Sequence, residues 1–138
     1  MGVRMDPVLV DTAYALALIS PRDEHHNRAL ELSYLFEGAS LHVTDGVLLE
    51  IGNALSRGFK QNAITLIQKF LVSGNVKVHH VTPELFAAGF ELYGKYPDKE
   101  WGLVDCISFV VMQREGIKAA LTHDKHFVQA GFKALMRD

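Results

Sequence analysis

The sequence has little cysteine and no long hydrophobic run. Its single cysteine, Cys106, cannot form a disulfide within the chain, which favours a reducing compartment. No stretch is long and apolar enough to span a bilayer, and the first residues lack the apolar segment of a secretion signal. We therefore expect a cytoplasmic protein without a membrane anchor. The chain also lacks internal repeats, a phosphate-binding glycine loop and a dinucleotide-binding fingerprint.

The chain has no excess of positive charge. It carries 14 Lys and Arg against 16 Asp and Glu, for a net charge of -2. Proteins that bind nucleic acid through bulk charge are usually basic, so this balance argues against non-specific DNA coating. An enzyme with an acidic metal site and a local basic rim is still compatible with it. Hydrophobic residues make up 49 % of the 138 residues, which predicts one ordered domain covering residues 1–138.

Short apolar runs alternate with longer helical patterns along the chain. The runs predict strands at residues 7–11, 41–44, 76–81, 118–122 and 132–135. Helices are predicted at 12–19, 22–37, 60–72, 83–96 and 103–115, with a short one after residue 122. A further helix follows residue 44. This order predicts an α/β fold: a three-layer α/β/α sandwich around a mainly parallel sheet of about five strands.

Two of the predicted helices have apolar residues at helical spacing, which we expect to face the core. The helix after residue 44 would bury Val47, Leu48, Ile51, Ala54 and Leu55. The helix at 60–72 would bury Ile64, Ile67, Phe70 and Leu71.

Four acidic residues follow predicted strands or begin predicted helices. Asp11 ends the first strand, and Glu50 lies two turns into the helix after the second. Asp105 starts the helix at 103–115, and Asp124 comes just after the strand at 118–122. In parallel sheets ligands bind beyond the carboxyl ends of the strands. We therefore expect these acids to meet at one edge of the sheet.

Such a group of acids has a specific chemistry. A buried carboxylate is costly unless it is paired or binds a metal, and carboxylate oxygens without nearby His or Cys suit Mg²⁺ or Mn²⁺. A site of this kind activates water and stabilises the charge that develops on a phosphate. A structural interpretation stays open. Asp11 and Asp124 could cap helices, and Asp105 could stabilise the first turn of a helix.

The sequence around these acids resembles the PIN-domain ribonucleases, and among them the VapC-like toxins. The similar segments are LVDTAYALAL, VTDGVLLEIGNAL, WGLVDCISFVVMQREGI and ALTHDKHFVQAGF, which follow in the family's order. The last two, with D-C-x-S-F and T-x-D-x-x-F, are the most specific. The resemblance implies a parallel sheet between helices, an acidic pocket, one or two Mg²⁺ or Mn²⁺ ions, and endonucleolytic cleavage of RNA.

The resemblance also implies roles for individual residues. Asp11, Glu50, Asp105 and Asp124 correspond to the catalytic and metal-binding acids, with Asp11 and Asp105 as central ligands and Asp124 acting through water. Thr12, Thr44 and Asn53 correspond to residues that surround these ligands. Three positions depart from the family: Ala13, Gly102 and Val104 stand where hydroxyl-bearing residues are common. Loss of such hydroxyls weakens metal binding without abolishing it.

A VapC-like toxin would have an RNA substrate and a small antitoxin protein that inserts a basic side chain toward the acids. Relatives commonly form homodimers, and the helical pair between Glu31 and Lys69 is the candidate surface. Two alternatives stay open. One is a non-catalytic RNA- or protein-binding module on the same fold, and the other is a phosphatase or DNA nuclease that uses the same pocket.

Several further residues could bind a metal, a base or phosphates. His123 and His126 could hold Zn²⁺ with a carboxylate, although solvated side chains are the simpler interpretation. The adjacent pairs His25–His26 and His79–His80 diverge and do not chelate easily. Cys106 is expected in the core, and Trp101 packs inside or stacks a base at the pocket rim. Candidates for phosphate contacts are Arg57, Lys60, Lys95, Lys99 and Lys125.

Overall fold

Five parallel strands form one sheet in the computed structural model, which describes residues 5–137. The order across the sheet is β3-β2-β1-β4-β5, and β1 pairs with β2 on one side and β4 on the other. The predicted parallel sheet is therefore confirmed. The strands are β1 (Val8–Val10), β2 (Leu41–Thr44), β3 (Val76–His79), β4 (Ala119–Leu121) and β5 (Lys133–Ala134).

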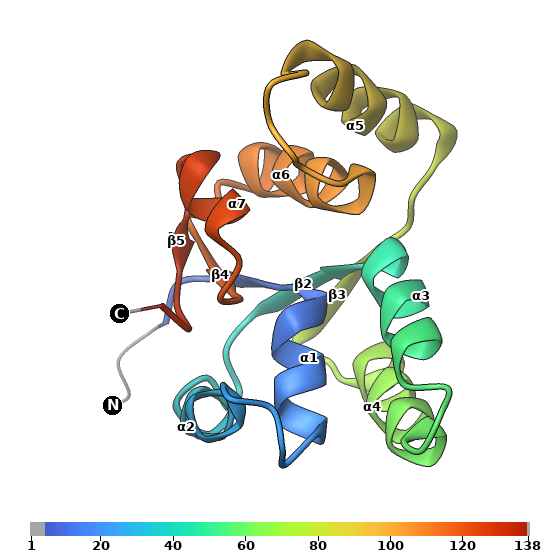
Figure 1. Ribbon diagram of the computed structural model, residues 1–138, viewed down its shortest axis with the longest axis vertical. Coiled ribbons are helices and arrows are strands. Elements are labelled where there is room, and N and C mark those ends of the chain that lie inside the picture. Colours follow the sequence, from blue (N-terminus) through green and yellow to red (C-terminus); the bar gives the residue numbers. More distant parts are fainter. Residues whose placement is uncertain (1–4, 138) are drawn as a thin grey trace.

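Helices cover both faces of this sheet, which confirms the predicted three-layer sandwich. In Figure 1, α1, α2, α3 and α4 lie on one face, α6 and α7 lie on the other, and α5 packs on α6 away from the sheet. No helix within residues 5–137 has the length and apolar character needed to cross a membrane. The helices are α1 (Thr12–Ile19), α2 (His26–Leu35), α3 (Asp45–Ala54), α4 (Lys60–Val72), α5 (Pro83–Lys95), α6 (Leu103–Glu115) and α7 (Lys125–Gln129).

The sheet separates two hydrophobic cores. Alternate side chains of β1 point to opposite faces: Val8 and Val10 join the core with α1 to α4, and Leu9 joins the core with α6 and α7. All three side chains are buried. Burial on both faces explains why this strand is continuously apolar rather than alternating. It also fixes β1, and the acid that follows it, at the centre of the sheet.

The second helix is shorter than predicted. It begins at His26 rather than at residue 22, and ends at Leu35. The residues before it form turns, with Asp23 donating its backbone N–H to Ser20 O and accepting, through Oδ1, from the His25 N–H at 2.8 Å. Asp side chains favour such turns because they hydrogen-bond their own backbone two residues on.

Part of the predicted apolar faces is wrong. Ile64 and Leu71 of α4 are 40 % and 58 % exposed, and Ala54 at the end of α3 is also exposed. Ala63 is buried instead, together with the predicted Phe70. The helix α4 lies at one edge of the layer and packs mainly against α3 and β3, so a narrow stripe of its surface is covered.

The close approach of α5 to α6 generates a stability prediction. A Cβ at the buried Gly89 would overlap the Ile107 side chain and lie 3.2 Å from Ile107 Cα. Gly89→Ala is therefore expected to destabilise the fold by about 1–3 kcal/mol, measured by urea denaturation. On the same helix, a Cβ at Gly94 meets nothing within 4 Å. Gly94→Ala should leave stability unchanged or raise it by up to about 1 kcal/mol. Equal stability of both variants would contradict this packing.

Candidate active site

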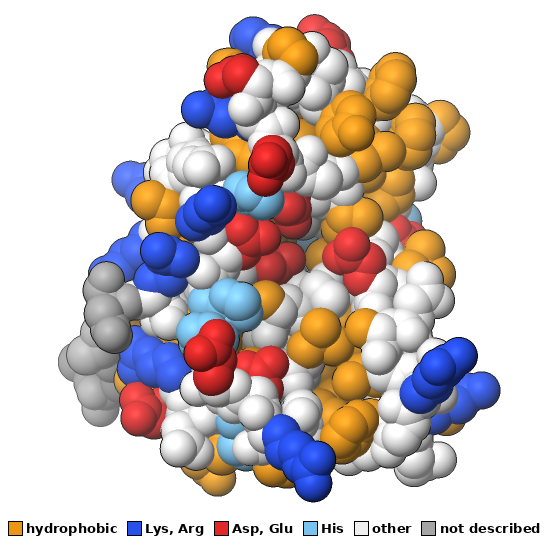
Figure 2. All heavy atoms as spheres, in the orientation of Figure 1, with side chains coloured by type: hydrophobic (Ala, Val, Ile, Leu, Met, Phe, Trp, Pro, Cys, Tyr) orange, Lys and Arg blue, Asp and Glu red, His pale blue; other side chains and the backbone are white. Residues whose placement is uncertain are grey.

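The four predicted acids line one cleft at the carboxyl edge of the sheet. Its volume is about 690 Å³. Figure 2 shows acidic side chains gathered in a hollow on this face, with histidine and basic side chains beside them. Of the seven residues predicted as the acids of the site or their neighbours, six line it: Asp11, Thr12, Glu50, Asn53, Asp105 and Asp124. The topology thus brings together residues more than 110 positions apart, as the separation of Asp11 and Thr122 shows.

Asp11 is the most buried of the acids, with 4 % of its surface exposed. It directly follows β1 and precedes α1, but its side chain makes no capping hydrogen bond. Instead its Oδ2 accepts a hydrogen bond of 2.7 Å from the Thr122 hydroxyl. The capping interpretation of the Asp11 side chain is therefore wrong. Asp124 does act as a cap, because its Oδ1 accepts from the His126 N–H at the start of α7.

Two threonine hydroxyls hold the acids in place. Thr12 Oγ1 donates to Glu50 Oε1 at 2.6 Å and so joins α1 to α3. Thr122 Oγ1 donates to Asp11 and accepts from the Asp124 N–H at 3.0 Å. Thr122 was not identified as a site residue from the sequence, although it begins the T-x-D pattern after β4.

Thr44 does not line the cleft. It is fully buried at the end of β2, and its Oγ1 accepts a hydrogen bond from the Val47 N–H. Its side chain therefore caps α3, the helix that carries Glu50. A fifth acid, Asp23, lines the cleft from the turn before α2. No motif in the sequence pointed to Asp23.

The carboxylates of the cleft are in an unfavourable environment when no cation is present. Burial raises the pKa of Asp105 to about 7, with further contributions from the nearby Asp11, Asp124 and Glu50 charges. Burial also raises the pKa of Asp11 to about 6, although its hydrogen bond from Thr122 acts in the opposite direction. Within residues 5–137, no Lys or Arg forms an ion pair with these acids.

His126 faces the acids from α7. Its Nδ1 lies 3.3 Å from Asp124 Oδ1 and 3.6 Å from Asp105 Oδ2. This buried nitrogen makes no hydrogen bond with any described residue. The pairing of His123 with His126 around one ion, the less favoured of the two interpretations, is not formed, because the His123 ring stacks on His25 with the centroids 4.0 Å apart. His123 lies before α7 begins, so the two rings do not share a helix face.

The donor set of the cleft suits a divalent cation. Several carboxylate oxygens converge there, and Asp105, Asp124 and His126 place one ligating atom each within 4.8 Å of one another. A hard divalent ion takes oxygen ligands, and its charge would offset both the burial and the neighbouring negative charges that raise the pKa of Asp105. The residues of the cleft can therefore hold a metal ion.

The remaining candidates are structural or lie at the surface. Trp101 is buried, packs edge-on against Phe109 and donates through Nε1 to Gln129 Oε1, so the packing interpretation is correct. Cys106 is buried in the core as predicted. Lys95 lies over the Tyr96 ring.

Two arginines missed from the sequence border a second hollow of about 590 Å³. Arg28 and Arg137 line it together with His25 and His123, and His123 also lines the acidic cleft. Arg137 Nη1 donates to His123 O at 2.9 Å, and Arg28 Nη2 donates to Leu135 O at 3.2 Å. Glu24 also lines this hollow and Arg28 pairs with Glu31 at 3.0 Å, so two arginines and an acid lie directly beside the acidic cleft.

Comparison with known proteins identifies the family to which this fold belongs. The family model described as PIN domain matches residues 8–133. The chain belongs to the PIN-domain family. The 23S rRNA-specific endonuclease VapC20 from two strains of Mycobacterium tuberculosis is 30% identical over 125 residues, which span 91% of this chain and 95% of the relative. The predicted VapC-like PIN domain is thus confirmed.

Solved structures agree with this assignment. The crystal structure of Mycobacterium tuberculosis VapC20, described as a Sarcin-Ricin loop cleaving toxin, superposes with a TM-score of 0.80 at 29% identity, covering 91% of this chain and 95% of that one. DNA-bound VapBC from Salmonella typhimurium has a TM-score of 0.65 at 13% identity, covering 94% and 97%. FitAcB from Neisseria gonorrhoeae has a TM-score of 0.60 at 14% identity, covering 92% and 94%. The last two show the fold alone.

The raised pKa values of Asp11 and Asp105 generate a prediction about metal-free stability. Both lie above the ordinary value of 3.8, so the folded protein binds more protons than the unfolded chain between about pH 4 and 7. The two acids therefore lower the free energy of unfolding as pH rises through that window. Asp105→Asn keeps the shape and removes one charge. In EDTA it should stabilise the protein by about 1–3 kcal/mol more at pH 8 than at pH 5.

The difference in the free energy of unfolding between wild type and Asp105→Asn reports Asp105 alone. Other groups change stability with pH in the opposite direction. Burial lowers the pKa of His42, His79 and His123, and these contributions raise stability with pH below about 6.5. They are present in both proteins and cancel. The measurement is urea denaturation at the two pH values, and an identical stability difference at pH 5 and pH 8 would contradict the raised pKa of Asp105.

Proposed function

We propose that this protein is a metal-dependent endoribonuclease and the toxin of a toxin–antitoxin pair. One observation carries the proposal: four carboxylates from distant parts of the chain line one cleft without a Lys or Arg partner among the described residues. Family membership and the similarity to an rRNA endonuclease support the same conclusion. A non-catalytic binding module has no need of such a costly charge cluster.

The proposed cofactor is Mg²⁺ or Mn²⁺, held by Asp11 and Asp105 with Glu50 and Asp124. When bound, such an ion lowers the pKa of water and offsets negative charge on a phosphate. The protein's own contribution is to position the acids. Thr122 fixes one oxygen of Asp11, and Thr12 fixes one oxygen of Glu50.

The hydroxyls of Thr12 and Thr122 orient acids of the cleft. Three other positions, Ala13, Gly102 and Val104, lack the hydroxyl that is common in the family. Gly102 is one of those positions, and a Cβ there would lie 3.9 Å from Asp105 Oδ2. A serine side chain at this point would contact Asp105 directly. The absence of that contact explains our expectation of weaker metal binding at Asp105, while the bonds of Thr12 and Thr122 still orient the other acids.

We propose a structured loop of ribosomal RNA as the substrate. The basis is the relative whose description names 23S rRNA and the Sarcin-Ricin loop. In this proposal Arg28 and Arg137 bind phosphates next to the scissile bond, because their hollow adjoins the cleft at His123. A ribosomal RNA substrate supports our proposal of a cytoplasmic location, which the sequence also predicts.

The proposed partners are an antitoxin and a second copy of the chain. For the homodimer, the predicted surface between Glu31 and Lys69 carries exposed apolar side chains at the ends of α2 and α4, among them Tyr34 and Leu35. Tyr34 and Lys69 line one cavity of about 360 Å³ at this surface. For the antitoxin, Figure 2 shows hydrophobic side chains over α5, and Phe86, Phe90 and Tyr93 are exposed in a stacked row on that helix.

The nuclease proposal is tested by RNA cleavage with purified wild type and Asp105→Asn in Mg²⁺, Mn²⁺ and EDTA. We expect wild-type cleavage that requires metal, and a loss of at least about 100-fold in Asp105→Asn, because the substitution removes a charge that holds the ion. Parallel reactions with single-stranded DNA and a small phosphate ester distinguish the DNA nuclease and phosphatase alternatives. Equal cleavage by both proteins would refute the assignment of Asp105.

The proposed RNA path is tested by binding to an inactive protein. Against the Asp105→Asn background, Arg28→Ala and Arg137→Ala should each weaken RNA binding and reduce the slope of log affinity against log salt by about 1. The matched control is Lys118→Ala, since Lys118 is exposed at the amino end of β4, away from the cleft. An unchanged salt slope in both arginine variants would exclude this path.

A further inference from the structure

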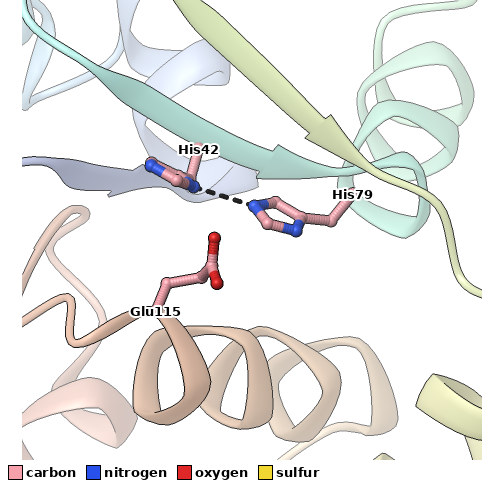
Figure 3. A group of neighbouring side chains, drawn as sticks. All are labelled: His42, His79 and Glu115. Carbon is pink, nitrogen blue, oxygen red and sulfur yellow. Dashed lines mark hydrogen bonds between the residues drawn. The ribbon is translucent and has the colours of Figure 1, made fainter.

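A second group of potential metal ligands lies on the sheet face that α6 covers. His42 of β2, His79 of β3 and Glu115 at the end of α6 direct their side chains toward one another (Figure 3). No sequence pattern predicted this group, because His79 stands next to His80, whose side chain points the other way along a strand. Strand pairing brings His79 beside β2 instead, where Thr44 is its partner in register and His42 lies two residues earlier on the same face.

The geometry of the three side chains is compact. His42 Nδ1 lies 2.8 Å from His79 Nε2, and the two rings and the Glu115 carboxylate each place one ligating atom within 4.8 Å of the others. His42 is only 8 % exposed, whereas Glu115 is exposed at the surface. The group is therefore held at its base by the sheet and open to solvent at Glu115.

This group is separate from the acidic cleft. Glu115 is the last residue of α6 and Asp105 lies in its first turn. Ten residues of helix place them about 15 Å apart along the axis. A metal bound by Glu115 cannot share ligands with one bound by Asp105.

The protons of the two imidazoles can be arranged for metal binding. The facing nitrogens, His42 Nδ1 and His79 Nε2, lie at hydrogen-bond distance, 2.8 Å apart. One N–H therefore bridges the two nitrogens. If His42 Nδ1 is the donor, the proton can move to the other nitrogen of the same ring, Nε2. That nitrogen faces the Ser40 hydroxyl at 3.4 Å. Both facing nitrogens then offer lone pairs without loss of a proton from the protein.

We propose that His42, His79 and Glu115 form a second metal site for a borderline divalent cation such as Zn²⁺. Two imidazole nitrogens and one carboxylate oxygen are ligands that Zn²⁺ prefers, whereas Mg²⁺ requires mostly oxygen. Three protein ligands leave one position of a tetrahedral ion for water. Ligand nitrogens on such an ion lie about 3.3 Å apart, so the rings separate by a few tenths of an ångström on binding.

One interaction competes with the ion. Lys77 Nζ lies 3.4 Å from Glu115 Oε1, and the Lys77 side chain is 63% exposed. Exposed ion pairs of this length contribute little stability, so the cation displaces it readily. The bound ion would connect β2 and the edge strand β3 to the end of α6. Zn²⁺ should therefore raise the unfolding temperature of the whole chain.

The experiment is Zn²⁺ titration of the full chain by calorimetry, with thermal unfolding recorded in parallel. Wild type, His79→Gln, Glu115→Gln, His80→Gln and Asp105→Asn are compared. His80 is the matched control because it is adjacent in sequence, exposed, and paired with Asp45 instead. Asp105→Asn reports zinc bound in the cleft. Thermal unfolding of each variant without zinc shows whether that variant is folded. If His79→Gln is unfolded, the comparison of wild type with Glu115→Gln tests the proposal.

We expect wild type, His80→Gln and Asp105→Asn to bind one tight equivalent of Zn²⁺ that raises the unfolding temperature. His79→Gln and Glu115→Gln should bind it at least about tenfold more weakly, since even outer-shell losses cost this much. The proposal is overturned if wild type binds no zinc, if the ligand variants keep wild-type affinity, or if the tight equivalent is lost in Asp105→Asn.

Discussion

Two acids that the fold withdraws from water, Asp11 and Asp105, are the constraint on which the carboxyl edge of this sheet depends. Asp11 follows the central strand, Asp105 comes from the helix on one face, and Glu50 comes from a helix on the other. Burial and mutual charge raise the pKa of Asp11 to about 6 and that of Asp105 to about 7. A bound divalent cation offsets the negative charge of these buried carboxylates. Acids that are costly for folding alone can then serve catalysis.

The architecture both buries these acids and offsets part of the cost of burying them. Parallel strands end at the same edge, so the acids after β1 and β4 meet without any local signal between them. Asp11 and Asp124 stand at the starts of α1 and α7, and Asp105 lies in the first turn of α6. The positive ends of those helix dipoles favour negative charge. Thr12 and Thr122 donate hydrogen bonds that hold individual carboxylates in position.

The sequence predicted the order of elements and the meeting of the acids, because hydrophobic periodicity and parallel topology determine both. It did not predict which side of α4 is buried, since Ile64 and Ala63 are distinguished only by the helices beside them. Thr122, Asp23 and Arg137 were missed because their roles depend on contacts across the fold. His42 and His79 likewise meet only through strand register. The family resemblance predicted the four acids, and the structure shows the hydrogen bonds from Thr12 and Thr122 that position two of them.

Proton release on Mn²⁺ binding tests the central claim most directly. Calorimetric titrations of wild type in buffers of different ionisation enthalpy give the number of protons released at each pH. If Asp11 and Asp105 are partly protonated without metal, binding should release protons near pH 6 to 7, and this release should fall toward zero by about pH 8.5. Binding of Mn²⁺ without any proton release between pH 6 and 7, or binding unchanged in Asp11→Asn, would contradict the account.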